Sequence, residues 1–490
     1  MMQLRKECRG QIKNVDSFLD ALTHFESLLK ILPNFRFLDM IRSIEQGKSI
    51  GFEGAFLGFL YVVWANNSTV KKYLFPTEKH ESITKKAVIF LMTMRFQEER
   101  GRITWEEIAW MVAATRFDFT FLVHSERPIV ETCGMGWDIG FWATNFNHLY
   151  AQLGEQIQSG FVAQSDLSED DYYDFLMNQV IIPDREIKQS YKTKNKKSVN
   201  ISTLSSFILG SMGYATMKHG SGKNTTAVGS TDAVVKFRVP IIFSSNDEPE
   251  KKLKMDSFVY TDATISKTIH DISGNVLKTE TVNHLIWPMT PPIDRHTQIN
   301  KILWVNHNVS FSVLGKAYET IHEKGIYNIG DVIIVGWFSE LPSMLSSNLH
   351  KDICLDEFSP KWSMLWVLID GKYIGEFLIT EKDFWVDIDM NQVLLEWSED
   401  IISSANEQTL VNKANENIIQ LVCCNAALGI LVANGNMRKS DFIINGSINS
   451  VYLKAAYEQA RKQISSLRVN NFVASIRVKM NQIMKEEVSI

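Results

Sequence analysis

The 490-residue chain has few cysteines, and nothing in their spacing suggests that they act together. They include no pair at CxxC spacing and their number is odd, so neither a disulfide framework nor a zinc site is expected. We therefore expect a reducing, cytoplasmic location. The five cysteines are Cys8, Cys133, Cys354, Cys423 and Cys424.

Long apolar runs and a strong charge excess are also missing. The N-terminal "MMQLRKECRGQIKN" has no apolar core of the kind that a signal peptide needs. The most apolar run, Gly54 to Ala65, is far short of the about 20 residues that span a bilayer, and we interpret it as a buried helix. A net charge of -5 with 45% hydrophobic residues is ordinary for a soluble globular protein. We expect neither a nucleic acid nor a membrane partner.

Patterns in the first 125 residues indicate helices. Residues Ser82 to Phe96 have apolar positions at helical spacing. Thr104 is followed three residues later by Glu107, which is typical of a capping box at the start of a helix. A chain of this length is expected to form two or more domains, and the residues up to about 125 are predicted to be helical.

After residue 125 the pattern changes to alternating strands and helices. Residues 128–140 are predicted to be extended and to run into a glycine turn, and 330–338 a buried strand. "SVNIST", "LSSFILGSMG" and "YATMKHG" predict strand, helix, strand, as in a βαβ unit, while 417–435 and 450–466 predict helices. The acidic 165–174 and basic 192–197 runs are interpreted as solvated faces. The order favours an α/β fold with a separate helical part and a mostly parallel sheet.

The stretch "MKHGSGKNTTAVGSTD", Met217 to Asp232, is rich in groups that suit phosphate. Its glycines, serines and threonines expose backbone N–H groups and hydroxyls. Lys218 adds a positive charge at the end of a predicted strand, where ligands bind in such sheets. A P-loop is excluded, because Asn224 follows Lys223 where serine or threonine is required.

Residues Val199 to Asp232 resemble the anthranilate phosphoribosyltransferase-like family, the class IV phosphoribosyltransferases. That family has Phe-Asn-Ile-Ser-Thr, then Lys-His-Gly-Asn-Arg, paired small hydroxyl residues and Gly-Ser-Ala-Asp. Further segments resemble the family's motifs in the same order. They are Cys133 to Asp138 (Gly-Thr-Gly-Gly-Asp), His284 to Ile293 (Leu-Gly-Pro-Leu-Thr-Asn-Pro), Cys354 to Ser359 (Leu-Asp-Glu) and Asp370 to Phe384.

The resemblance implies a two-domain, class IV phosphoribosyltransferase-like fold and a homodimer formed through the helical domain. The helical domain is expected over residues 1–125, completed by a helical segment near 290–325. The α/β domain is expected over 126–490, with insertions near 140–197 and 338–353.

The resemblance also implies transfer of ribose-5-phosphate from phosphoribosyl diphosphate (PRPP) to an aromatic amine or nitrogen heterocycle. No nucleic acid partner is expected. Mg²⁺ would offset the diphosphate charge, held by Asp356, Glu357 and Ser202. Lys218 and His219 are the implied catalytic residues, although His219 could equally be a core histidine or line the acceptor side. The implied PRPP-binding residues are Gly134, Gly136, Asp138, Asn200, Ser202, Thr203, Lys218, Thr225 and Thr226.

Departures from the family pattern put the acceptor in question. Met135 and Trp137 replace Thr and Gly in the diphosphate loop, and Ser221 stands where the family has an acceptor-contacting Asn. Gly274 aligns, by spacing, with the family's acceptor-binding Arg, which would pair with the anthranilate carboxylate. His219, Ser221 and Gly274 therefore define an acceptor side that we expect to bind something other than anthranilate.

Two other functions remain open on these residues. One is a true anthranilate phosphoribosyltransferase of tryptophan synthesis, and the other is a non-catalytic homologue that binds PRPP, which Trp137 favours and the intact Asp356–Glu357 pair disfavours. Pyrimidine nucleoside phosphorylases share the fold, but their Lys-x-Ser and Thr-Gly-Gly-Thr patterns do not occur here.

Overall fold

The structure is a computed structural model, and it carries a seven-stranded central sheet. It describes residues 37–46, 48–50, 55, 58, 80–99, 102–115, 122–135, 168–175, 198–220, 228–239, 241, 252–254, 258–262, 286–305, 311–338, 358, 360, 362–396 and 398–487. The strand order is β5-β3-β2-β6-β7-β8-β9. The first five strands are parallel, and β8 and β9 extend the sheet antiparallel.

The mostly parallel sheet predicted from the sequence is confirmed. Its strands are β5 (Phe258–Asp262), β3 (Ala215–Gly220), β2 (Ile129–Met135), β6 (Gln298–Val305), β7 (Asn328–Phe338), β8 (Trp362–Ile369) and β9 (Lys372–Ile379). Two small pairs lie outside it: β1 (Leu122–His124) with β4 (Lys252–Lys254), and β10 (Ile443–Ile444) with β11 (Ser447–Ile448).

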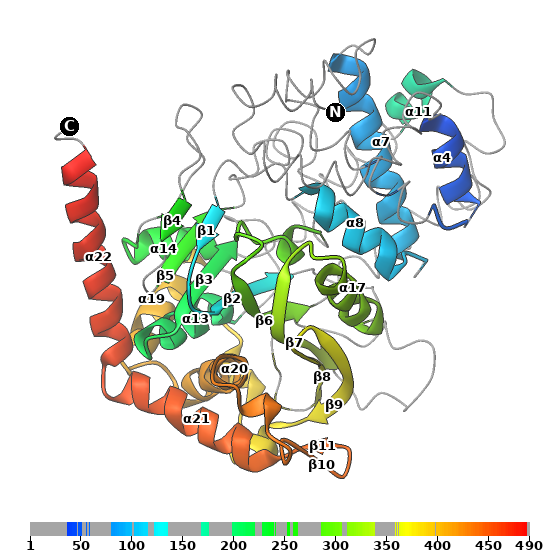
Figure 1. Ribbon diagram of the computed structural model, residues 1–490. Coiled ribbons are helices and arrows are strands. Elements are labelled where there is room, and N and C mark those ends of the chain that lie inside the picture. The colour runs from blue at the N-terminus through cyan, green and yellow to red at the C-terminus, as the bar shows by residue number, and fades with distance from the viewer. Residues whose placement is uncertain are drawn as a thin grey trace.

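One face of the sheet packs against helices from the second half of the chain. These are α13 (Ile201–Ser211) and α20 (Glu416–Ala433). Helix α21 (Ser450–Ser465) packs on α20 and α13, and α22 (Arg468–Glu487) runs along the outside of α13 (Figure 1). Shorter helices α14 (Ser230–Lys236), α18 (Met390–Val393) and α19 (Glu399–Leu410) surround this layer. We call this side of the sheet the α13 face.

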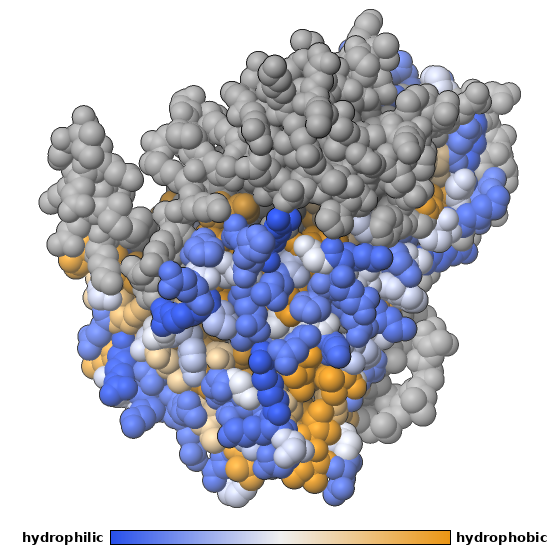
Figure 2. Space-filling model, in the orientation of Figure 1, coloured by the Kyte–Doolittle hydropathy of each residue, from blue (hydrophilic) through white to orange (hydrophobic). Residues whose placement is uncertain are grey.

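Helix α20 is the core of that layer. By length and composition it could cross a membrane, and within the described residues it is the one helix that passes this test. Its most apolar window is 78% buried, however, against α13, α21 and the sheet. Helix α20 is therefore the buried helix of a folded core. On the face of the molecule drawn in Figure 2, hydrophilic residues cover much of the surface and hydrophobic residues form smaller patches between them.

The opposite face meets α17 (Phe311–Glu323) and then the helices of the first half of the chain. Helix α17 packs on β7, β8 and β9 and on α8 (Trp105–Thr115). Beyond α8 lie α7 (His80–Glu99), α4 (Phe37–Glu45) and α11 (Glu169–Phe175), grouped on one side of the molecule in Figure 1. We call this side of the sheet the α17 face.

Several local predictions are confirmed by the structure. The capping box of α8 is present, since Thr104 N–H donates to Glu107 Oε2 at 2.9 Å and Glu107 N–H donates to Thr104 Oγ1 at 3.3 Å. The predicted strand at 330–338 and the two C-terminal helices are also observed as β7, α20 and α21. Of the apolar run 54–65, the described Ala55 and Gly58 are helical and buried.

Three local predictions are wrong. "SVNIST" is not a strand: residues 198–200 are irregular and α13 begins at Ile201, because the backbone N–H of Asn200 donates to Asn406 Oδ1 and not to a neighbouring strand. The region before residue 125 is not wholly helical, since it contains β1.

The third correction concerns the segment 290–325, in which the described residues (290–305 and 311–325) form an α-helix over α17 alone. Its apolar stretch at 298–305 forms β6, a central strand of the sheet, because it pairs with both β2 and β7 and is buried on both faces. Helix α17 does contact α8. The division into a helical domain and an α/β domain stays a prediction.

Candidate active site at the carboxyl ends of β2 and β3

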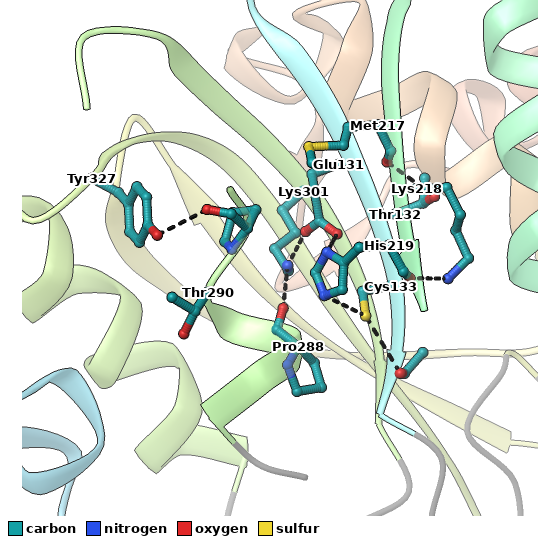
Figure 3. Close-up of polar contacts among 12 residues, drawn as sticks. Glu131, Thr132, Cys133, Met217, Lys218, His219, Pro288, Thr290, Lys301 and Tyr327 are labelled. Carbon is teal, nitrogen blue, oxygen red and sulfur yellow. Dashed lines mark hydrogen bonds and ion pairs between the residues drawn. The ribbon is translucent and has the colours of Figure 1, made fainter. Parts of the chain in front are cut away.

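The predicted donor and acceptor residues meet where β2 and β3 end. The two strands are parallel neighbours with Thr132 opposite Lys218. This register brings Gly134, near the end of β2, to the same sheet edge as Lys218 and His219 of β3. Because side chains alternate along a strand, Lys218 and His219 point to opposite faces, as Figure 3 shows. One dipeptide therefore serves two different environments.

On the α13 face, Lys218 is buried. Only 1% of the residue is exposed, and its Nζ donates to the carbonyl oxygen of His219 at 2.5 Å. Lys218 is therefore not a solvated lysine at a strand end. An ammonium at this position can form charge-assisted hydrogen bonds with phosphate oxygens.

The start of α13 lies at the same edge and leaves its first-turn N–H groups without a side-chain cap. Ser202 and Thr203 are in this first turn, and both are buried. Within the described part of the chain, the Thr203 hydroxyl has no hydrogen-bond partner. Uncapped N–H groups and the positive end of the helix dipole attract anions, so this turn suits a phosphate group.

Asn200 holds this helix start in place. Its side-chain oxygen accepts from Asn406 Nδ2 at 2.7 Å, and its Nδ2 donates to the Val228 carbonyl at 2.9 Å. Through these two contacts, Asn200 connects the start of α13 to Asn406 of α19 and to the backbone at Val228. Sequence reasoning missed Asn406, because it lies 206 positions from its partner and no local pattern marks it.

The loop after β3 is bounded by two well-packed residues. A side chain at Gly220 would place its Cβ 2.7 Å from the Cβ of Ser230, so only glycine fits there. At the other end, Asp232 Oδ2 accepts the Gly229 N–H at 2.8 Å and caps α14. Asp232 therefore shapes the loop, while the loop residues between 220 and 228 lie outside the described residues.

On the α17 face, four charged or polar side chains from three adjacent strands form a buried cluster (Figure 3). His219 Nδ1 lies 2.9 Å from Glu131 Oε1, and His219 Nε2 lies 3.0 Å from Cys133 Sγ. Lys301 of β6 forms an ion pair with the other oxygen of Glu131 and donates to the Pro288 carbonyl at 2.5 Å. All four are at most 2% exposed. We call Glu131, Cys133, His219 and Lys301 the β2–β3–β6 cluster.

Two further buried hydroxyls accompany this cluster. Burial lowers the pKa of the Lys301 ammonium well below its ordinary value. Thr261, which is opposite His219 in β5, and Tyr318 of α17 are buried, and neither hydroxyl has a hydrogen-bond partner among the residues that the structure describes. The hydroxyls of Thr261 and Tyr318 could therefore each form a further hydrogen bond.

Two metal sites have to be distinguished. Ligand atoms of Glu131, Cys133 and His219 lie within 4.8 Å of one another, and such a set suits zinc more than magnesium, which prefers oxygen ligands. The predicted Mg²⁺ pair Asp356–Glu357 lies outside the described residues. The third predicted ligand, Ser202, is on the α13 face, away from this cluster.

Several predicted site residues fall where the structure gives no description, and their roles stay predictions. They are Gly136, Asp138, Ser221, Thr225, Thr226, Gly274, Asp356 and Glu357, as well as Trp137. Most of both insertions lies there too; α11, from the first insertion, contacts α7 through an ion pair of 2.6 Å between Lys85 and Asp170. The structure brings Gly134, Asn200, Ser202, Thr203, Lys218 and His219 to one edge of the sheet.

The chain is similar in sequence to a known phosphoribosyltransferase. No family model matches the chain. Anthranilate phosphoribosyltransferase from Pelagibacter ubique (strain HTCC1062) is 25% identical over 287 residues, which cover 57% of this chain and 74% of that protein. In sequence, the chain is similar to the anthranilate phosphoribosyltransferase family.

Solved anthranilate phosphoribosyltransferases have the same fold. The enzyme from Thermus thermophilus aligns with a TM-score of 0.54 and 15% identity, covering 90% of this chain and 98% of its own. The Saccharomyces cerevisiae enzyme in complex with PRPP and Mg also aligns at 0.54 and 15%, covering 94% and 98%. The predicted class IV phosphoribosyltransferase-like fold is therefore confirmed.

Proposed function

We propose that this chain is a Mg²⁺-dependent phosphoribosyltransferase that moves ribose-5-phosphate from PRPP to an aromatic amine or nitrogen heterocycle. The observation that carries the proposal is the α13 face of the sheet edge. There, a buried lysine, an uncapped helix start and the glycine Gly134 lie at the ends of adjacent strands. The similar proteins are named for this reaction, and one of them was solved with PRPP and Mg.

The residues of this face would bind the diphosphate and stabilise it as it leaves. The first-turn N–H groups of α13 and the Lys218 ammonium supply fixed positive potential where negative charge builds up on the leaving group. Asn200, held by Asn406, keeps the helix start aligned. Catalysis would then depend on orientation and electrostatics, without a covalent intermediate.

The predicted metal ligands complete the donor side. Asp356, Glu357 and Ser202 would hold Mg²⁺, which supplies counter-charge to the diphosphate when bound. Gly136 and Asp138 would form the remainder of the diphosphate loop with Gly134. Thr225 and Thr226 would contribute hydroxyls from the loop after β3.

The acceptor would bind on the side of His219, and we propose that it lacks the carboxylate of anthranilate. Ser221 and Gly274 stand where the family has the Asn and Arg that contact anthranilate. An unpaired carboxylate in a closed site is costly to bury. The nearby Lys223 and Lys278 are flexible point charges without the planar fork of a guanidinium.

Anthranilate itself is the second candidate. A yeast relative that aligns with a TM-score of 0.50 was solved with 4-fluoroanthranilate. Complementation separates the two candidates: this gene at ordinary expression should not restore growth without tryptophan to a bacterium that lacks its own anthranilate phosphoribosyltransferase. Growth would make anthranilate the acceptor. We also propose that the protein is cytoplasmic and that it forms a homodimer.

A screen for diphosphate release tests the reaction class. The full chain is incubated with PRPP, Mg²⁺ and a panel of aromatic amines and nitrogen heterocycles that includes anthranilate. We expect release that needs both Mg²⁺ and one acceptor of the panel, and much weaker release with anthranilate. Measurable PRPP binding without release for any acceptor would support a non-catalytic homologue, and the absence of binding would contradict the proposal.

A further inference from the structure

Asn425 is a polar residue in the middle of the apolar helix α20. The other residues from Leu421 to Val432 are apolar and buried, and Asn425 itself is fully buried. A buried amide is costly unless its polar atoms are paired. The contacts of Asn425 therefore show which parts of the fold it connects.

The side-chain oxygen of Asn425 joins three parts of the chain. Oδ1 accepts from Trp304 Nε1 of β6 at 2.7 Å and from the backbone N–H of Phe358 at 3.0 Å. Nδ2 donates to the carbonyl oxygen of Leu421, one turn earlier in α20, at 2.9 Å. One oxygen thus connects the core helix with a central strand and with a residue 67 positions away in the sequence.

Trp304 lies beside the proposed donor site. It is opposite Gly134 in the register of β6 with β2. Its hydrogen bond to α20 places its side chain on the α13 face, whereas Lys301, an odd number of positions away, points to the α17 face. Trp304, Phe358 and Ile201, the first residue of α13, belong to one buried hydrophobic cluster. Phe358 is therefore on the same face as the uncapped start of α13.

Phe358 directly follows the predicted metal pair Asp356–Glu357. Its N–H belongs to the peptide group that links it to the residue before it, and a peptide group is planar. The Phe358 side chain is fully buried, and its ring centroid lies 5.0 Å from that of Phe384. The chain is thus fixed to the α13 face at the residue that follows the pair.

We propose that Asn425 is a positioning residue of the donor site. By holding Phe358 beside Trp304, it keeps the Asp356–Glu357 pair on the α13 face. Asn425 acts through Phe358 and touches neither PRPP nor metal. This role rests on the proposed function, since it assumes that the two carboxylates hold Mg²⁺ for PRPP.

A purely structural role is the alternative. The hydrogen bonds of Asn425 stabilise the fold whether or not PRPP binds, because buried N–H groups left without an acceptor cost free energy. That role predicts a less stable protein whose PRPP affinity is unchanged once it is folded. The positioning role predicts, in addition, a loss of affinity that depends on Mg²⁺, since the metal pair is the part that loses its support.

Three variants separate the two roles. Asn425→Leu removes the acceptor and keeps a side chain of similar size. Asn425→Asp keeps an oxygen in the position of Oδ1 and is the rescue variant. Cys423→Ala is the control for a change within α20, because Cys423 is fully buried in the same helix and its side chain is about 200° away around the helix axis.

The first measurement is hydrogen–deuterium exchange of single amides in the full chain without ligands. In Asn425→Leu, the Phe358 amide should exchange on the order of tenfold faster, the equivalent of one hydrogen bond, while amides in the middle of β6 keep their rates. Asn425→Asp should restore slow exchange, and Cys423→Ala should not change it. An unchanged rate at Phe358 in folded Asn425→Leu would overturn the proposal.

The second measurement is calorimetry of PRPP binding with and without Mg²⁺. With Mg²⁺, Asn425→Leu should weaken binding on the order of tenfold, and without Mg²⁺ the variant and the wild type should bind alike. Asn425→Asp should recover most of the affinity. Equal affinity of folded Asn425→Leu and wild type with Mg²⁺ would overturn the positioning role alone. A wild type that binds no PRPP would instead overturn the proposed function itself.

A measurement on the wild type decides the question even if Asn425→Leu does not fold. Support of the metal pair through Phe358 and binding of PRPP are linked, and linkage is reciprocal. PRPP with Mg²⁺ should therefore slow exchange of the Phe358 amide further, on the order of tenfold. No slowing at saturating PRPP and Mg²⁺, with binding verified by calorimetry, would overturn the proposal.

Discussion

The two faces of the sheet edge at β2 and β3 use the same strands for different purposes. The α13 face carries the Lys218 ammonium and the uncapped start of α13. The α17 face holds a charge-balanced cluster in which Glu131 lies against both Lys301 and His219. Positively charged donor groups suit a multiply charged anion, whereas a charge-balanced cluster suits a nearly neutral molecule.

This contrast follows from strand geometry. Lys218 and His219 are adjacent, yet the alternation of side chains sends them to opposite faces. The donor side and the acceptor side of a transferase can therefore be built from one dipeptide, and substitutions at the two positions should affect different steps. The following predictions test that separation.

The largest effect is expected on stability, from Lys301→Met. Removing the ammonium leaves the buried Glu131 carboxylate without its counter-charge, which should cost about 3–5 kcal/mol of unfolding free energy. Denaturant unfolding measures this, with the exposed Lys372→Met as the control. The double variant Glu131→Met/Lys301→Met should recover much of the loss; no recovery would mean that the ion pair does not explain the cost.

The metal pair comes next. Glu357→Gln should lower Mg²⁺-dependent PRPP turnover by at least about a hundredfold, which is typical of losing one electrostatic stabiliser, and leave the fold intact. Turnover at the wild-type rate would remove Glu357 from the metal site.

Lys218→Ala should weaken PRPP binding by roughly 1.5–3 kcal/mol, the worth of a charge-assisted hydrogen bond. Calorimetry with PRPP and Mg²⁺ measures it, and the exposed Lys236→Ala on α14 is the matched control. The comparison predicts that His219→Ala changes PRPP affinity much less. Equal losses at the two positions would contradict the assignment of donor and acceptor to separate faces.

The smallest effect is expected from Asn406→Ala, which removes the hydrogen bonds between Asn406 and Asn200. The backbone N–H and side-chain oxygen of Asn200 would lose their partners, at a cost of about 1–3 kcal/mol in unfolding free energy. Gln408→Ala, an exposed amide on the same helix, is the control. An unfolding free energy equal to that of the control would mean that the hydrogen bonds between Asn406 and Asn200 do not stabilise the fold.

Much of the α13 face could be predicted from the sequence, because its residues occur in contiguous motifs. Ser202, Thr203 and Lys218 all fall within one stretch that contains a helix start and a strand end. The strand assigned to "SVNIST" failed because Asn406, far away in the sequence, supplies the hydrogen bonds that define the start of α13.

The α17 face could not be predicted in the same way. Cys133 and His219 are 86 positions apart, and Glu131 and Lys301 are 170 apart, so only the pairing of β2 with β3 and β6 brings them together. The segment 298–305 was also predicted as part of a helical region, which concealed the strand that carries Lys301. The signal that the sequence offered was Lys301, a charged residue within the apolar stretch 298–305.

A crystal structure of the full chain with PRPP and Mg²⁺ would show which face of the sheet binds the diphosphate. We expect the diphosphate on the α13 face, within hydrogen-bonding distance of the first-turn N–H groups of α13 and of Lys218 Nζ, with the β2–β3–β6 cluster unchanged. Diphosphate bound on the side of His219, or density for PRPP away from the ends of β2 and β3, would contradict it.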